Sequence, residues 1–180
     1  MAVRPCLWYN NGDMEQDMNP TAMELAQEAP WASSRGRTVW TAILILSALG
    51  ILIAGYLTYV HIAQAKPYCA GLGDCERVNT GPYSQIAGIP VALLGLLAYA
   101  ALFGAALIVL RGGPGAEMAA LAVFGLALFG VLFSGYLTYL EIFIIRAICP
   151  WCVASAITIT LILLLSIGQV RALIGERDDA

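Results

Sequence analysis

The fold is decided by residues 38–65, TVWTAILILSALGILIAGYLTYVHIAQA, which contain no Asp, Glu, Lys or Arg over 28 positions. Three further stretches also lack these four residue types: residues 78–110, 118–140 and 147–170. A helix needs about 20 apolar residues to cross the roughly 30 Å hydrocarbon core of a bilayer. All four stretches are long enough, so the sequence predicts an all-α membrane protein, a bundle of four transmembrane helices.

The composition excludes other classes of protein. The chain has 180 residues, is 60% hydrophobic and carries a net charge of −3. Its 9 basic residues are scattered, so they form no basic face for nucleic acid. The polar sequence that remains is too short for a soluble catalytic domain.

The spans divide the chain into a membrane domain, residues 37–170, and two cytoplasmic tails. We place the spans at residues 39–63, 88–110, 117–141 and 150–170. Residues 1–36 have no apolar period and are expected to be disordered, and residues 171–180 form the short C-terminal tail. Residues 1–11 lack the features of a cleavable signal peptide, so the first span is expected to act as its own insertion signal.

The basic residues set the expected orientation. Six of them flank the side of the termini and three flank the other side, namely Lys66, Arg77 and Arg146. Because cytoplasmic loops are enriched in Lys and Arg, both termini are expected in the cytoplasm. The polar loop 66–87 and the link 142–149 then face outward.

An internal repeat relates the first and third spans. Residues 50–59, GILIAGYLTY, recur as residues 130–139, GVLFSGYLTY, with an offset of 80 that also carries Cys69 onto Cys149. Small and aromatic residues recur in any packed membrane bundle. Seven identities in ten ungapped positions favour a duplicated hairpin over that explanation.

Four of the five cysteines fall on the outward side in two pairs, and Cys6 is expected to be an inert cytoplasmic thiol. Cys149 and Cys152 form a CxxC motif in which Pro150 suits the first position of a helix. Cys149 then lies at the helix cap, where free N–H groups and the helix dipole lower a thiol pKa. Cys152 lies one turn further in, at the edge of the hydrocarbon.

Two cysteine pairs on an oxidising face suggest a disulfide relay from the loop pair, Cys69 and Cys75, to the CxxC pair. The sequence offers no nucleotide-binding site to receive the electrons, because the RGGPG turn at residues 111–115 is not a dinucleotide-binding motif. An apolar quinone dissolved in the bilayer therefore fits as the electron acceptor. Structural disulfides and a tetrathiolate metal site are the alternatives, although free thiols are disfavoured outside the cytoplasm. Four cysteines allow three pairings, and the spacing does not choose among them.

Three other residues near the outward ends of the spans carry polar side chains. His61 is interpreted as an interfacial residue rather than a proton relay. Glu141 and Arg146 are interpreted as marking the membrane interface.

The chain resembles the bacterial disulfide-forming branch of the vitamin K epoxide reductase family over about residues 37–169. The resemblance rests on GYLTYVH at residues 55–61, the loop cysteines Cys69 and Cys75, GIPVALLG at residues 88–95, and AICPWCV at residues 147–153. It implies a four-helix bundle around a quinone, ubiquinone or menaquinone, with an extracytoplasmic loop capping the site and no metal.

The resemblance also implies a role for each cysteine. Cys69 would form the mixed disulfide with a thioredoxin-like (DsbA-like) periplasmic protein, and Cys75 would attack or pair with Cys149. Cys152 would contact and reduce the quinone. All four cysteines are thus the predicted catalytic residues of a quinone-dependent thiol oxidase that supports disulfide formation.

The sequence departs from the family pattern at several positions. A Ser or Thr that many members carry after the second loop cysteine is Gly81 here, beside Thr80. The positions that hold the quinone oxygen in vertebrate members are Val91 and Ala156. The sequence reaches Ala180 without a fused thioredoxin-like domain, so the partner is expected to be a separate protein. The chain itself is expected to be a multi-pass protein of the cell inner membrane.

Other functions remain open. A DsbB-type oxidase has two comparable pairs but carries CxxC in its first outer loop, the reverse of this chain. Quinone or epoxide reduction could be the main role. A different class is a non-catalytic membrane subunit with structural disulfides or a cysteine metal site.

Overall fold

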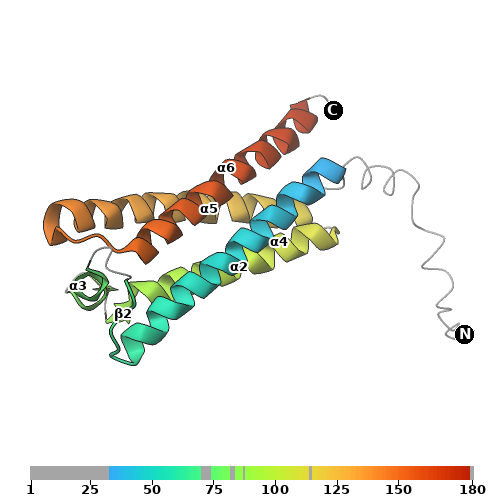
Figure 1. The fold of residues 1–180 in the computed structure, drawn as a ribbon. Coiled ribbons are helices and arrows are strands. Elements are labelled where there is room, and N and C mark those ends of the chain that lie inside the picture. The colour runs from blue at the N-terminus through green and yellow to red at the C-terminus, as the bar shows by residue number, and fades with distance from the viewer. Residues whose placement is uncertain (1–32, 70–73, 82–83, 87, 114, 179–180) are drawn as a thin grey trace, which may run out of the picture.

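Four long helices form most of the part of the chain that the structure describes, as predicted. The computed structural model describes residues 33–69, 74–81, 84–86, 88–113 and 115–178. The long helices are α2 (Ser34–Ile62), α4 (Val91–Arg111), α5 (Ala116–Tyr139) and α6 (Pro150–Asp178). Each contributes a stretch long and apolar enough to cross a membrane. Helix α2 begins and α6 ends at the same end of the bundle, opposite α3 and β2 (Figure 1).

The four helices pack as a ring. Both α2 and α5 contact α4 and α6, so α2 and α5 lie diagonally across the bundle. The core is filled by wholly buried side chains such as Trp40, Ile43, Leu102, Val123 and Ile162. Outward-facing side chains are large and apolar: Ile45, Leu52 and Leu132 are 63%, 70% and 66% exposed. Apolar surface on every side suits hydrocarbon rather than water, so this is a multi-pass membrane protein.

The repeated glycines lie where helices approach each other most closely. Gly50 of α2 faces the ring of Tyr99 of α4, which occupies the space that a Cβ atom would need. Gly130 of α5 faces Ile159 of α6, whose Cγ1 would be 2.8 Å from an added Cβ. Small residues allow such close packing in membrane bundles. The repeat therefore marks equivalent helix contacts in the two halves of the chain.

The predicted polar loop contains secondary structure that the sequence did not predict. Its centre forms the short helix α3 (Cys75–Thr80), which Asp74 caps by accepting a hydrogen bond from the Arg77 N–H at 3.2 Å. The strands β1 (Gln85–Ile86) and β2 (Ile89–Pro90) then pair antiparallel. Because residues 89 and 90 are extended, the second span begins at Val91 rather than at residue 88.

Three other predicted boundaries move. Ser33 caps α2 by accepting the Gly36 N–H at 3.0 Å, so residues 34–36 are helical rather than part of the tail. Residues 1–32, including Cys6, lie outside the described residues. The third span runs beyond residue 141 as a π-helix, η1 (Leu140–Ile145), which ends at Arg146 in the left-handed conformation with φ of 52°. Helix α6 continues beyond residue 170 to Asp178.

Candidate active site

The two loop cysteines are bonded to each other. Cys75 is the first residue of α3 and is 1% exposed, whereas Cys69 is only half-buried. Their Cα atoms are 6.2 Å apart, within the usual range for a disulfide. Of the three pairings that the sequence left open, the structure forms Cys69–Cys75 and leaves Cys149 and Cys152 as thiols.

The CxxC pair begins helix α6, as predicted. Pro150 is the first helical residue, and the carbonyl of Cys149 accepts the Val153 N–H at 3.1 Å. A hydrogen bond from the Cys152 thiol lowers the pKa of Cys149, with help from the backbone N–H groups of Cys152 and Trp151. Burial and the nearby Glu141 carboxylate oppose this effect. The lowered pKa was expected from the helix terminus, but the partner thiol is the largest cause.

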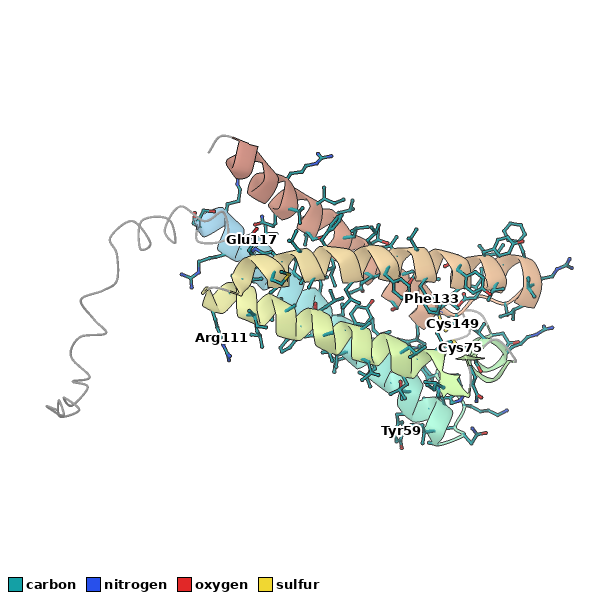
Figure 2. The ribbon with its side chains drawn as sticks, turned by 180° about the vertical axis from the view of Figure 1, so that it is seen from behind. Tyr59, Cys75, Arg111, Glu117, Phe133 and Cys149 are labelled. Carbon is teal, nitrogen blue, oxygen red and sulfur yellow. A yellow bond between two sulfur atoms is a disulfide. The ribbon has the colours of Figure 1, made fainter. Side chains whose placement is uncertain are left out.

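The loop docks directly on the start of α6. The Asp74 N–H donates to the carbonyl of Ile148 at 3.2 Å, which joins the residue before Cys75 to the residue before Cys149. Cys75 and Cys149 lie at one end of the bundle, and Arg111 and Glu117 lie at the other (Figure 2). The two cysteine pairs are therefore neighbours although they are far apart in sequence.

Aromatic residues hold this docked arrangement from a second side. The indole N–H of Trp151 donates to the carbonyl of Tyr68 at 3.0 Å, and the Tyr68 N–H donates to the hydroxyl of Tyr56 at 2.9 Å. The rings of Tyr56 and Trp151 lie 5.0 Å apart. One middle residue of the CxxC motif thus binds the segment that leads into Cys69.

Cys149, expected on the outward side, is not exposed to water in this arrangement. Its side chain has 0% exposure. The reason is the docked loop, because α3 contacts η1 and the residue before α3, Asp74, is hydrogen-bonded to Ile148. A thiol at a helix terminus would be open to solvent only if this loop moved away.

Cys152 lines a cavity between the helices of about 510 Å³. Most of its wall is apolar, including Ile53, Leu57, Leu102 and Phe133. Cavities of this size and character are typical of small-molecule sites. Their walls would accept the flat, apolar ring of a quinone, with a redox-active thiol at the edge.

Hydroxyl groups in the cavity come from residues that the sequence did not single out. Tyr99 donates to the carbonyl of Ser155 at 2.9 Å, and its hydroxyl lies 3.1 Å from the Ser155 hydroxyl. Both residues line the cavity beside Cys152. Val91 also lines it but has no polar side-chain atom. Tyr99 and Ser155 are therefore candidates for orienting a quinone oxygen, together with the other hydroxyl residues of the lining, Ser84, Ser134 and Thr138.

Glu141 is the residue most misjudged from the sequence. It does not mark the interface: it is 5% exposed, and its Oε2 accepts the Cys149 N–H at 3.3 Å. The same carboxyl group forms a hydrogen bond with the Cys152 thiol and lines the cavity. The π-helix explains this placement, because it rotates Leu140 and Glu141 inward while Ile142 and Phe143 remain exposed.

The repeat contained a signal for this residue. The offset of 80 that relates Cys69 to Cys149 also relates His61 to Glu141. His61 is 9% exposed, and its Nε2 lies 3.1 Å from Nε2 of Gln85. Both halves thus carry a buried titratable residue eight positions before a cysteine.

The described side chains do not assemble a metal site: no three His, Cys, Asp or Glu residues among them come together as a metal ion would need. The Cys69–Cys75 bond also engages two of the four thiols that a tetrathiolate site would use.

Comparison with known protein families agrees with this geometry. The model of the vitamin K epoxide reductase family matches residues 41–167. The chain belongs to this family, which is a family of quinone-associated oxidoreductases.

Proposed function

We propose that the protein is a quinone-dependent thiol oxidase that regenerates a thioredoxin-like disulfide donor. One observation carries the proposal: an oxidised loop pair is docked on a reduced CxxC pair whose inner thiol lines an apolar cavity. This is the arrangement expected just after electrons have moved from the loop pair to the CxxC pair.

The exposures of the loop cysteines support the order of the first exchange. Cys69 is partly exposed, whereas Cys75 is buried. A thiolate of the partner would therefore attack Cys69, form a mixed disulfide and release Cys75 as a thiolate. The second thiol of the partner then displaces Cys69, so the partner leaves oxidised and the loop pair is left reduced.

The contact between the loop and α6 supports the second exchange. The Cys75 thiolate attacks Cys149 in an oxidised CxxC pair, and the electron pair of the broken bond moves to Cys152. Cys69 then attacks Cys75, which restores the loop disulfide and frees Cys149. The low pKa of Cys149 makes it a good leaving group in this last step.

The cavity supports the choice of final acceptor. A quinone bound there would take up two electrons and two protons and leave as a quinol. Cys152 borders the site, and Tyr99 and Ser155 offer hydroxyl groups for orientation. In the proposed orientation, both termini face the cytoplasm of a cell inner membrane and the docked loop faces the periplasm.

Quinol formation by the purified full-length chain tests the proposal. A reduced thioredoxin-like protein is mixed with the chain and with a short-chain ubiquinone or menaquinone, and quinone absorbance is followed. We expect one quinol per oxidised partner, loss of activity in Cys152→Ala and in Cys75→Ala, and full activity in the matched control Cys6→Ala. Quinol formation that survives Cys152→Ala, or none with either quinone, would contradict the proposal.

A further inference from the structure

Glu141 is an ionisable group beside the CxxC pair. Its carboxyl group is buried and meets two groups of the CxxC segment, the Cys149 N–H and the Cys152 thiol. In the state described, with both thiols reduced, the Cys149 N–H donates to the carboxyl group, and the single proton of the Cys152 thiol is shared between the Cys149 sulfur and the carboxyl group. A carboxylate that accepts a thiol hydrogen bond at a reacting sulfur can take up or return that proton.

We propose that Glu141 is a catalytic residue that exchanges a proton with Cys152 in each turnover. The inference rests on the proposed function for its direction, but its main step takes place within the chain. It adds to the four cysteines a fifth reacting group on η1.

The proton balance follows from the exchange between the two pairs. When the Cys75 thiolate attacks Cys149, the Cys75–Cys149 bond forms and the Cys149–Cys152 bond breaks. The electron pair goes to the Cys152 sulfur, which takes its proton from the Glu141 carboxyl group. The carboxylate that results can accept the Cys149 N–H, as Oε2 of Glu141 does in the reduced state.

Reoxidation reverses the proton transfer. As the Cys149–Cys152 bond forms and two electrons leave to the quinone, the Cys152 proton returns to Glu141. The quinone takes its two protons from water, and the thiols of the partner release the same number to water. Without an acceptor at Glu141, the Cys152 sulfur would have to gain and lose its proton in a cavity whose wall is mostly apolar.

Among the side chains that the structure describes, the CxxC thiols are the titratable groups that act on Glu141. Helices α3 and α5 pack against η1. Their described charged or titratable side chains near η1, and that of Arg146, which ends η1, are exposed to solvent: Arg77, Tyr136, Tyr139 and Arg146. On α4, Tyr99 lines the same cavity but is bonded to Ser155.

A difference infrared spectrum tests the proton transfer without any quinone. Fully oxidised protein should show a carboxylic acid C=O band that disappears on reduction with dithiothreitol. The band should be absent in Glu141→Gln, whose amide oxygen can still accept the Cys149 N–H, and present in the matched variant His61→Gln. Absence of the band from the wild type, or its persistence in Glu141→Gln, would overturn the inference.

Single-turnover exchange supplies a second readout. Oxidised, quinone-free protein is mixed with dithiothreitol, quenched with acid, alkylated and analysed by mass for reduced Cys149 and Cys152. A Cys69→Ala/Cys75→Ala double variant gives the rate of direct reduction. Loss of general acid catalysis should slow the exchange in Glu141→Gln by about 100-fold and remove a pH dependence that His61→Gln retains. An unchanged rate and pH profile would overturn the inference.

These results are separable from the proposed function. If the wild type makes quinol but Glu141→Gln exchanges normally, Glu141 is not the proton acceptor and the oxidase stands. If the wild type makes no quinol but the infrared band follows the redox state, the oxidase proposal fails and the role of Glu141 in the exchange stands.

Discussion

The two halves of the repeat share a scaffold and differ at their outer ends. Residues 50–69 and 130–149 each contain a close-packed glycine, the GYLTY sequence, a buried titratable residue and a cysteine at the same spacing. After the first half the chain enters the loop, and Cys69 pairs with Cys75. At the end of the second half a π-helix and a left-handed turn lead straight to Cys149 and α6.

The difference teaches how one scaffold gives two kinds of cysteine. The cysteine of the first half is partly exposed and joined to a loop. That of the second half is wholly buried, at a helix start, beside a carboxylate and a cavity. The first suits exchange with another protein, and the second suits transfer to a membrane-soluble acceptor.

The largest expected effect is a difference in stability loss between substitutions at the two repeated glycines, Gly50 and Gly130. Gly50→Ala would place a Cβ against the Tyr99 ring, which is held by its bond to Ser155. Gly130→Ala would meet the flexible Ile159 side chain. We expect a loss of about 3 kcal/mol for Gly50→Ala and about 1 kcal/mol for Gly130→Ala, measured by thermal unfolding in detergent.

Two further glycines provide the control for this comparison. Nothing lies within 4 Å of a Cβ at Gly104 or Gly125, so Gly→Ala there should leave stability unchanged or slightly raised. Equal losses for Gly50→Ala and Gly130→Ala would mean that the two contacts are not distinguished by the rigidity of the facing side chain.

A smaller effect sharpens the comparison of the two cysteine pairs. The loop pair is a disulfide, whereas Cys149 is a thiol whose pKa is lowered mainly by the Cys152 thiol. Thiolate absorbance should therefore show Cys149 titrating below the range of an ordinary cysteine. Replacing Cys152 by Ala removes the thiol that contributes most to lowering the Cys149 pKa, so this pKa should rise.

The direction of the Cys149 pKa shift can be checked by measuring the rate at which Cys149 is alkylated. The thiolate is the reactive form, so alkylation of Cys149 should decline as the pH falls through its pKa. In Cys152→Ala the decline should begin at higher pH. If the pH midpoint of Cys149 alkylation is unchanged or lower in Cys152→Ala, the lowered pKa is due to the helix terminus and not to the Cys152 thiol.

The parts of the fold that depend on composition could be predicted from the sequence. A charge-free stretch must satisfy its backbone hydrogen bonds within a helix in lipid, so four helices followed from four such stretches. Pro150 fixed the start of α6 in the same way. Helix α3 depends on one capping residue, Asp74, and on contact with Ile148, and neither gives an apolar period.

The parts of the site that depend on three-dimensional contact could not be predicted. Which cysteines pair depends on where the loop docks, not on spacing. Glu141 looks like an interfacial residue in a line of sequence, and only the π-helix and the turn at Arg146 bring it inward. Burial of Cys149 likewise depends on the loop, through the bond between Asp74 and Ile148.

The central claim is that electrons cross from one half of the repeat to the other through Cys75 and Cys149. In Cys69→Ala, the Cys75 thiolate can attack an oxidised Cys149–Cys152 pair, and no Cys69 thiol is present to displace Cys149 from the product. Peptide mapping after alkylation under non-reducing conditions should then find a Cys75–Cys149 disulfide with Cys152 alkylated. A Cys75–Cys152 link, or an intact Cys149–Cys152 bond beside alkylated Cys75, would contradict the account.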